Sequence, residues 1–524
     1  MLLEQSLRLP PQVVAAGVVV VITIVIKLFF LPAKIPQELK NIPLVGGEDE
    51  QAKAQFVKSG FDLLQEGYRK YPDGAFRVWT PNGFVVLISR RFIDELKNLP
   101  EDQADFYSAN EEMVLSKYTR IERDPLIVDT IKNDLTGNLG LSILLQIHES
   151  KNADGKNWKT AKVMPAVIDE ASYAVSTELP QGNEWESFPV YHKATRIIAL
   201  IAGRAFLGLP INRNEDWIKS EIEYPADVFH GAFRLKKYPS ILRPFVYRAL
   251  PEFQRIFAHY AQAQRLILPV LKERAKAWKN GSHERPNDVM QYEMENARGD
   301  VLAPFHVQAK SQITAALGTI HTSSGALTHS LFDLASRPEY QQPLREEVLA
   351  VLKEEGGTLE KKAMNKLKKL DSFLKESLRL NPPNQIAFLR RALTKIVLSD
   401  GTIIPKGTFF AVPSGCISLD PMVWKNATEF DGFRFSRLRD ESSENANRYQ
   451  FVTISFDSLH FGYGRHACPG RFFASNQIKT VLALLVKDYD LSLEEGQTER
   501  PANITTETQV LPNMTESIRM RKRA

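Results

Sequence analysis

One cysteine near the end of the chain has neighbours that suit it to bind a metal. Cys468 lies in the segment 461–470 (FGYGRHACPG), and the amphipathic stretch 471–488 follows it. We expect that stretch to be a helix, whose first N–H groups would stabilise a thiolate. His466, two residues before the sulfur, can donate a hydrogen bond to an anionic group. A lone thiolate in this setting suits the fifth ligand of a haem iron.

The glycines of the segment support this interpretation. Gly464 and Gly470 would let the backbone approach a flat, bulky partner. The alternative for any single cysteine is a small buried apolar side chain, and this is what we expect of Cys416. A pattern of Phe, Gly, a basic residue, Cys and Gly at the spacing of 461, 464, 466, 468 and 470 would arise by chance in roughly 1 of 10⁴ chains of this length. We therefore interpret Cys468 as a ligand.

A second set of polar residues interrupts a long apolar helix predicted over residues 305–336. Its middle reads AALGTIHTSS and contains Gly318, His321 and Thr322. A hydroxyl in mid-helix can bond back to a carbonyl and open the helix to a water or dioxygen molecule. Imidazole titrates near neutral pH, so His321 can pass protons. The alternative is that the hydroxyls only crowd a buried helix and that His321 is a satisfied core histidine.

A third set consists of one acid and two arginines. Glu376 and Arg379 are three residues apart and would share one helix face. A second guanidinium, from Arg434 in the segment FDGFRF, can complete the bonding that a buried carboxylate needs. A Glu-x-x-Arg pair is usually solvated, but apolar neighbours and a following Pro-Pro stop make burial the better interpretation here.

Taken together, these segments resemble the cytochrome P450 superfamily, the haem-thiolate monooxygenases. The match is carried by the Glu-x-x-Arg helix, the arginine segment and the cysteine loop, which follow one another along the chain in the family's order. The resemblance implies haem as the cofactor and a buried ion-pair network behind its loop. The residues that it assigns to the haem site are Cys468 as iron ligand, His466, Phe461, Glu376, Arg379 and Arg434. One departure is Gly432, which stands where the family often has proline and leaves the rigidity of that loop open.

The helix 305–336 resembles the family's oxygen-activating helix. Gly318 matches the small residue of that helix and Thr322 its threonine, while His321 replaces the usual acid. The resemblance implies that Thr322 assists O–O cleavage and that His321 feeds the proton relay. Of these two residues, His321 is the one whose type differs from the family's.

Weaker signals concern the haem propionates. Trp158 and Lys162 are similar to a Trp-x-x-x-Arg helix of the family, with lysine in place of arginine. Lys132 is an equally good candidate on the preceding segment. Arg390 and Arg391 follow the Pro-Pro stop and are further candidates, the alternative being surface arginines on an ordinary strand.

The elements that must position these residues are mostly helical. Apolar periodicity predicts helices at 91–99, 164–177, 191–207, 251–279, 305–336 and 339–355. Residues 74–89 alternate around Pro-Asn-Gly, which predicts a hairpin, and 392–410 is strand-like. We expect residues 140–157 to form a surface excursion. The expected fold is mostly α with small β-sheets: by the resemblance, one large P450 unit.

Composition limits the class of protein. The 524 residues are 43% apolar and 25% charged, which excludes a disordered or collagen-like chain. Net charge is +5, too mild to predict a nucleic-acid partner. Two cysteines cannot form a disulfide scaffold or a multi-cysteine metal site.

The N-terminus predicts a membrane anchor. Residues 13–26 (VVAAGVVVVITIVI) carry no charge, and the apolar run resumes after Lys27. Its length is close to the roughly 20 residues that cross a bilayer, and no cleavage site follows it. We expect an anchor at 1–32, a proline-rich hinge at 33–44 and a catalytic domain at 45–524. Basic residues after the run place that domain on the cytoplasmic side. Together with the resemblance, this implies the endoplasmic reticulum membrane.

The resemblance implies a monooxygenase that uses O₂ and electrons from NADPH through a partner reductase. No flavin or dinucleotide motif occurs in the chain, so NADPH–cytochrome P450 reductase would be a separate protein. The lysine cluster at 361–369 is either a solvated face or a docking site for that reductase. The amino-acid sequences of the motifs are similar to those of fungal enzymes of secondary metabolism. This predicts an apolar substrate such as a terpenoid, sterol-like, polyketide or indole alkaloid intermediate.

Three alternatives remain open at the level of sequence. A haem-thiolate enzyme can rearrange a peroxide without a reductase, although Thr322 would then have no role. A haem sensor or carrier would bind the same cofactor without turnover. A haem-free scaffold would show no haem absorbance at all.

Overall fold

The described part of the chain is mostly helical and contains four small sheets, joined by turns and loops. The computed structural model describes residues 35–136, 163–281 and 285–524. The α-helices are α2 (Gln37–Lys40), α3 (Glu50–Lys70), α4 (Ile93–Leu96), α5 (Phe106–Met113), α6 (Ser116–Thr119), α7 (Pro125–Asp129), α9 (Val163–Glu178), α10 (Val190–Phe206), α11 (Glu215–Lys236), α12 (Arg243–Val246), α13 (Pro251–Lys279), α14 (Val289–Asn296), α15 (Phe305–Ser336), α16 (Gln341–Glu354), α17 (Lys361–Lys366), α18 (Lys368–Leu380), α19 (Ser414–Ser418), α20 (Arg434–Asp440) and α21 (Arg471–Asp488). The mostly α fold with small sheets is thereby confirmed.

The largest sheet has six strands in the order β1-β2-β3-β9-β6-β4. Its strands are β1 (Leu44–Val45), β2 (Ala75–Thr80), β3 (Gly83–Ile88), β4 (Ala104–Asp105), β6 (Ala387–Ala392) and β9 (Phe409–Val412). The predicted hairpin is β2–β3, which pairs antiparallel from Ala75 opposite Ile88 to Thr80 opposite Gly83. The segment 392–410 is more broken than predicted, because only its ends belong to this sheet.

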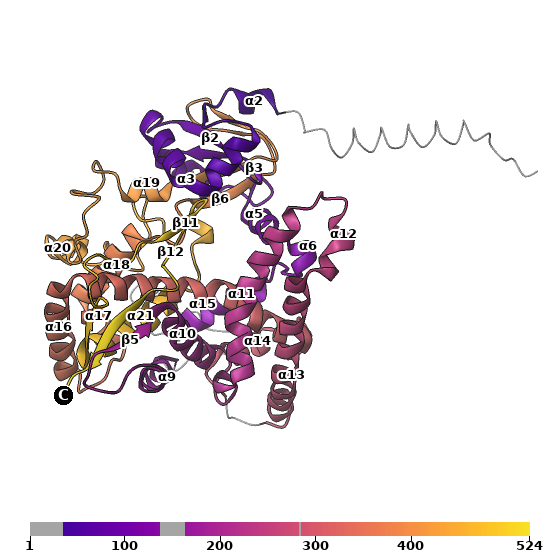
Figure 1. The fold of residues 1–524 in the computed structure, drawn as a ribbon. Coiled ribbons are helices and arrows are strands. Elements are labelled where there is room, and N and C mark those ends of the chain that lie inside the picture. Colours follow the sequence, from indigo (N-terminus) through magenta and orange to yellow (C-terminus); the bar gives the residue numbers. More distant parts are fainter. Residues whose placement is uncertain (1–34, 137–162, 282–284) are drawn as a thin grey trace, which may run out of the picture.

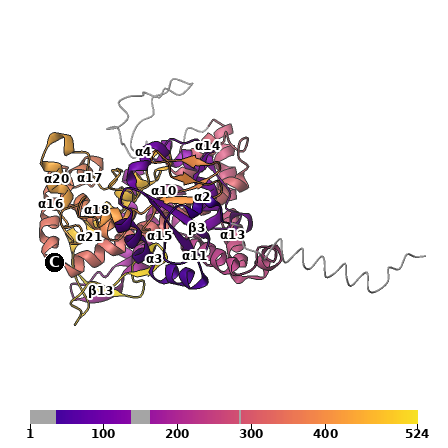
Figure 2. The same cartoon turned by 90° about the horizontal axis from the view of Figure 1, so that it is seen from above.

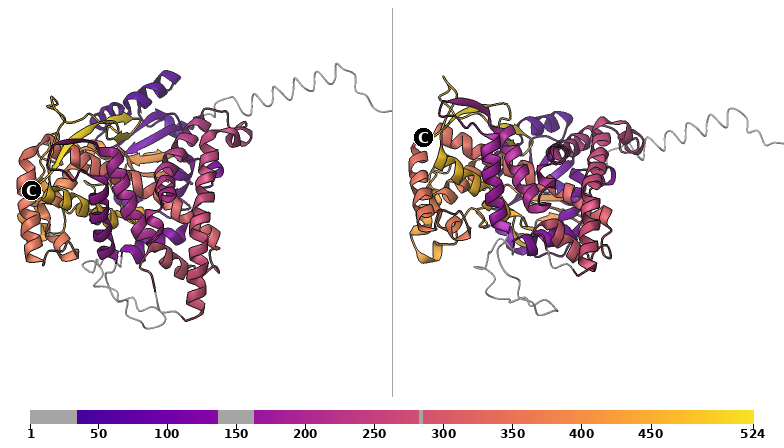
Figure 3. Two further views of the ribbon diagram at one scale, coloured as in Figure 1. Left: turned by 60° about the horizontal axis from the view of Figure 1, so that its bottom comes forward. Right: turned by 90° about the horizontal axis from the view of Figure 1, so that it is seen from below.

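The other sheets are short. Strands β10 (Tyr489–Ser492), β13 (Ser517–Lys522) and β5 (Glu186–Pro189) pair antiparallel in that order. Two hairpins complete the set, β7 (Ile396–Val397) with β8 (Ile403–Ile404) and β11 (Ile504–Thr506) with β12 (Gln509–Leu511). Figure 3 shows the C-terminal strands, in yellow, beside α16, and Gln341 of α16 donates to the Leu491 carbonyl of β10 at 2.8 Å.

The six-stranded sheet and the helical part of the molecule have separate hydrophobic cores. The six-stranded sheet and α3 lie at one end, above the helices, as Figures 1 and 2 show. The helical part is built around α15, which packs against α10, α11, α13 and α18. At 32 residues, α15 is about 48 Å long, long enough to cross this part of the molecule.

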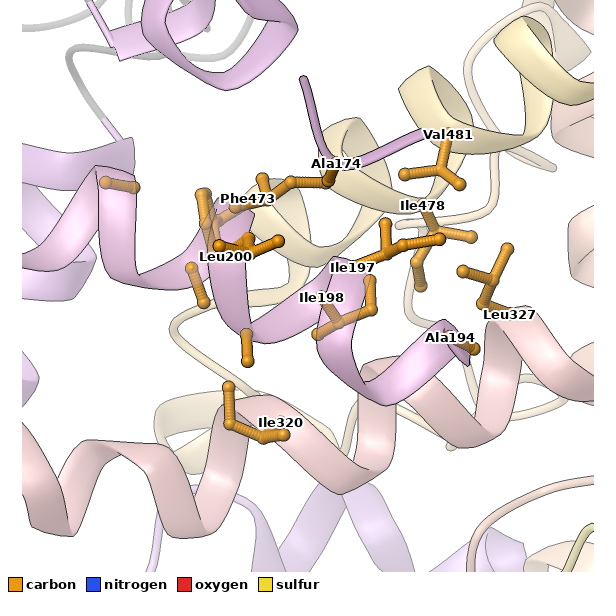
Figure 4. Close-up of a cluster of buried hydrophobic side chains, with 14 of the residues drawn as sticks. Ala174, Ala194, Ile197, Ile198, Leu200, Ile320, Leu327, Phe473, Ile478 and Val481 are labelled. Atoms are coloured by element: carbon orange, nitrogen blue, oxygen red, sulfur yellow. The ribbon is translucent and has the colours of Figure 1, made fainter. Parts of the chain in front are cut away.

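The centre of the helical core is aliphatic. Figure 4 shows side chains of α9, α10, α15 and α21 meeting there, among them Ile198, Ile320 and Phe473. Ile198 and Ile320 are fully buried, and Phe473 is 2% exposed. These contacts join α21, which follows the cysteine loop, to the helix that carries Thr322.

Several predicted segments lie outside the described residues. They are the anchor at 1–32, the excursion at 140–157, and Trp158 and Lys162. The hinge at 33–44 is described from residue 35, where it forms α2 and reaches β1. In the described part of the chain, no helix is both long and apolar enough to cross a membrane.

The core predicts a clear difference between two truncations. Ile198→Ala should lower the free energy of unfolding by about 2–5 kcal/mol, because it leaves a cavity at a fully buried site. Val397→Ala, at a side chain that is 56% exposed on β7, should change it by less than about 0.5 kcal/mol. Urea unfolding followed by circular dichroism measures both, and equal effects would contradict this placement of the core.

Candidate active site

Cys468 is held at the end of a tight loop. Its backbone N–H donates to the Phe461 carbonyl at 2.7 Å, which closes the segment between them. Gly462 and Gly464 have φ of 71° and 70°, a left-handed conformation that glycine adopts without strain. A Cβ on Gly464 would also lie 3.2 Å from the Lys97 Cβ. Gly464 is therefore needed for the turn and its packing.

The sulfur of Cys468 lies where the helix α21 begins. Burial raises the pKa of the Cys468 thiol, while the backbone N–H groups of Gly470 and Arg471 and the Arg471 guanidinium act in the opposite direction. Arg471 also donates to the Cys468 carbonyl at 2.9 Å. These donors would favour a thiolate once a metal takes the place of the proton. Cys416 has no such set: it is buried, and burial raises its pKa to about 12.

His466, on the same loop as Cys468, has aromatic and polar neighbours from the segment 101–106. Its ring stacks on Phe106 with centroids 4.9 Å apart, and its Nε2 lies 3.8 Å from a Glu101 carboxylate oxygen. Burial, with help from the Arg390 guanidinium, lowers the pKa of His466 to about 4. His466 is therefore neutral at pH 7 and keeps one N–H donor.

Of the two arginines after the Pro-Pro stop, Arg390 is turned inward. Strand β6 has an irregular register between Ala387 and Arg390, and Phe388 there has a φ of 59°. Arg390 is 5% exposed, and its guanidinium lies 5.0 Å from the centre of the Phe106 ring. It forms no ion pair with any residue that the structure describes. Arg391 points outward instead and pairs with Glu112 at 3.3 Å.

Burying a guanidinium without a carboxylate partner raises the free energy of the folded protein. Burial accordingly lowers the pKa of Arg390 to about 10. A carboxylate would relieve this cost by a charge-assisted hydrogen bond. Lys132, the other described candidate, lies exposed on the π-helical turn η2 (Thr130–Leu135). Arg390 is therefore the stronger candidate for an anionic ligand group.

The helix α15 opens toward solvent only locally in its middle. Gly318 and Thr322 are exposed, although Ala316, Ile320 and Ser323 around them are buried. A Cβ on Gly318 would meet no atom within 4 Å. Thr322 donates its hydroxyl proton to the Gly318 carbonyl at 2.9 Å, as the sequence predicts.

His321 does not share this open face. Its two ring nitrogens contact the Tyr191 hydroxyl at 2.7 Å and the Ile222 carbonyl at 2.9 Å. Burial lowers its pKa below the ordinary value of 6.5. The structure therefore joins Gly318 and Thr322 on one face of α15 and places His321 on another.

Glu376, Arg379 and Arg434 form a buried network. Arg379 binds the Glu376 carboxylate with two bonds of 2.8 and 2.7 Å, and the Nε of Arg434 lies 3.1 Å from the same group. Glu376 is fully buried and Arg379 is 2% exposed. The remaining guanidinium N–H groups donate to backbone carbonyls of residues 418, 425–427 and 429. The predicted contact of the three residues is confirmed.

Two residues with structural roles, Lys375 on α18 and Tyr191 on α10, were not anticipated from sequence. Lys375, beside Glu376, donates to the Gln450 and Thr453 carbonyls at 2.9 and 3.2 Å. The signal was a lysine among the apolar residues of α18, where a charge is rarely fully buried. Tyr191 gave no signal, since an aromatic residue near the start of a helix is usually part of the core.

Comparison with known proteins identifies the family. A family model for cytochrome P450 matches residues 192–519. The chain is 36% identical over 476 residues to cytochrome P450 monooxygenase AN1598 of Emericella nidulans, which covers 90% of this chain and 84% of the relative. It is 34% identical to cytochrome P450 monooxygenase braC of Annulohypoxylon truncatum, with 92% and 93% covered.

The chain belongs to the cytochrome P450 family. Proteins of this family bind iron protoporphyrin IX through a cysteine thiolate and act as monooxygenases. The residues present fit that cofactor: a thiol with N–H donors directed at it, a buried arginine without a carboxylate, and glycines at 318 and 470 whose Cβ positions no atom approaches within 4 Å. In this P450 the loop, the arginine and the open face of α15 come from three separate parts of the chain.

The buried network predicts a large effect for its acid. Glu376→Ala leaves two buried guanidinium groups without their carboxylate, so we expect a loss of about 3–5 kcal/mol in the free energy of unfolding and little haem-loaded protein. Glu50→Ala removes a pair of the same spacing, with Lys53, that is solvent-exposed, and should have no measurable effect. Expression yield, haem absorbance and urea unfolding report both variants. A well-folded Glu376→Ala protein would contradict the assignment.

Gly432, the departure from the family pattern, gives a second prediction. A Cβ there would lie 2.7 Å from the Tyr340 ring and 2.8 Å from the Phe373 ring. Gly432→Ala should therefore destabilise the fold by about 1–3 kcal/mol through overpacking. Gly74→Ala, where a Cβ would meet no atom within 4 Å, is the matched control and should be close to neutral. Thermal unfolding of both variants checks this, and a neutral Gly432→Ala would show that the rings yield.

Proposed function

We propose that this P450 inserts one oxygen atom of O₂ into a C–H bond of an apolar small molecule, with Cys468 as the axial haem ligand. The observation that carries the proposal is the setting of Cys468 at the start of α21, closed by its bond to the Phe461 carbonyl and surrounded by N–H donors. Haem supplies the iron that activates O₂, and thiolate donation favours O–O cleavage.

The chain's own residues would have distinct tasks. Arg390 and neutral His466 would bind the haem propionates, the first by charge and the second through its one N–H. The Thr322 hydroxyl donates a hydrogen bond to the Gly318 carbonyl. Its oxygen can therefore still accept a hydrogen bond on the open face of α15. From there it can hold and pass a proton. Glu376, Arg379 and Arg434 hold the segments that precede the cysteine loop.

The substrate class rests on two kinds of support. The related cytochrome P450 monooxygenases come from fungi, and the sequences of the chain's motifs resemble those of fungal enzymes of secondary metabolism. A terpenoid, sterol-like, polyketide or indole alkaloid intermediate would fit. The tethered form proposed here agrees with a substrate that partitions into lipid.

A membrane-bound form at the endoplasmic reticulum is part of the proposal. The apolar run within residues 1–32 would be the anchor. An apolar patch supports a membrane-facing body: Phe233 is 54% exposed at the end of α11, and Leu242 and Phe245 are 46% and 79% exposed at α12. Exposed patches of this kind mark partner or membrane surfaces. In Figure 1, α12 lies at the right edge of the body, and α2 lies at its top.

Electrons would come from NADPH–cytochrome P450 reductase as a separate partner. The lysine cluster at 361–369 is a weaker docking candidate than its sequence indicates. Lys366 binds Glu354 and Glu355, and Lys368 binds Asp440 at 2.9 Å. Since these carboxylates neutralise part of the cluster, we place the reductase site elsewhere on the protein.

The two cysteines provide the test of the ligand. The reduced protein with carbon monoxide should show the red-shifted thiolate band, and Cys468→Ala should lose it because no thiolate remains. Cys416→Ala is the matched control and should keep the band. A band that survives in Cys468→Ala would contradict the ligand assignment. NADPH consumption with the reductase and an apolar substrate then separates a monooxygenase from a peroxide-rearranging enzyme or a haem sensor, neither of which would consume it.

A further inference from the structure

Both nitrogens of His321 are already occupied, and their partners determine which one carries the proton. Nε2 lies 2.9 Å from the Ile222 carbonyl, which can only accept, so Nε2 must be the donor. Nδ1 is then the acceptor, and the Tyr191 hydroxyl donates to it at 2.7 Å. The rings of Tyr191 and His321 are nearly parallel, with an angle of 18° between them. His321 is thus fixed as the neutral Nε2–H form.

The carbonyl that accepts from His321 lies three residues before a proline inside α11. Pro225 stands inside that helix and has no N–H to give to the Glu221 carbonyl. The helical bonding of the preceding turn therefore lacks one donor. Ile222 follows Glu221 directly, and the N–H of His321 reaches its oxygen from α15.

The bonds of His321 therefore join three helices at one point. Tyr191 belongs to α10, Ile222 to α11 and His321 to α15, and these helices pack against one another along their lengths. The junction is one residue away from Thr322. Tyr191 is 7% exposed, and its own backbone carbonyl accepts from Thr195 at 2.7 Å. The backbone of Tyr191 is thus held within α10 independently of His321.

We propose that His321 is a latch that fastens the proline-containing helix α11 to α15 beside Thr322, and that Tyr191 is the positioning residue that sets its tautomer. The latch fixes how closely α11 approaches the threonine-bearing turn. In this role His321 moves no proton, because its N–H and its lone pair are both used. The proposal rests on the monooxygenase function only in that the turn carries Thr322; the helix contact itself does not depend on it.

Two substitutions of His321 separate the latch from a proton relay. The amide nitrogen of Gln falls near Nε2 of histidine, whereas that of Asn falls near Nδ1. His321→Gln can therefore still donate to the Ile222 carbonyl, and His321→Asn cannot. Neither amide can relay a proton at neutral pH, so a relay would treat both alike.

Hydrogen–deuterium exchange of the haem-loaded protein, read by mass spectrometry on peptides within 217–229, measures the latch. We expect His321→Asn to raise exchange there about five-fold or more, as for the loss of one buried hydrogen bond. His321→Gln should stay close to wild type, and Tyr191→Phe should lie between them. Tyr173→Phe on α9, whose ring is 37% exposed, is the matched control and should change nothing.

The contrary results are equally distinct. Unchanged exchange in His321→Asn would overturn the latch. Equal and large losses of NADPH-driven turnover in His321→Gln and His321→Asn, with exchange unchanged, would establish the relay instead. The carbon monoxide spectrum of the wild type is recorded first. A missing thiolate band there would overturn the proposed function, whereas the exchange comparison would still decide the helix contact.

Discussion

The rest of the site depends on one buried carboxylate. Glu376 has no contact with solvent, so the free energy of its desolvation must be offset by direct bonds. Arg379 and Arg434 supply these, and the Asp431 N–H adds another at 3.0 Å. Since a guanidinium has five donors in a fixed plane, each arginine also binds backbone carbonyls of the segment 418–429. The ion pair therefore gives a loop without regular structure one defined path.

The helix that carries Glu376 holds the next segment as well. Lys375 binds carbonyls at 450 and 453, and burial lowers its pKa to about 8. One turn earlier, Asp371 accepts from the Phe451 N–H at 2.8 Å and from Lys479 of α21 at 3.0 Å. Successive polar residues of α18 thus bind the chain on both sides of α20, and then α21 itself. The position of Cys468, between these two contacts, follows from a few hydrogen bonds of α18.

Sequence patterns predicted the parts of the fold whose signals are local. The bounds of α13 and α15 agree with prediction, because each begins at a proline or directly after one and is apolar over many turns. The helix α3 was missed, since glycines and a non-helical Ser59 interrupt it, and α11 was missed because Pro225 lies inside it. Residues 91–99 form only one short helix, α4, after a 3₁₀ turn. Tertiary packing decides these cases.

The middle of α15 shows why site residues were easier to find than their partners. Its hydroxyls donate to carbonyls one turn back, at 324 and 328 as well as at 322, so a polar sequence can be buried without orphaned donors. Any Ser or Thr can do this, and the pattern alone does not say which face stays open. That depends on what packs outside: α10 and α11 cover His321, while Gly318 and Thr322 are left uncovered. Because residues 318 and 322 are four apart, they lie on one face of α15. The neighbouring helices then determine that Thr322 can contact a ligand, whereas His321 binds α10 and α11.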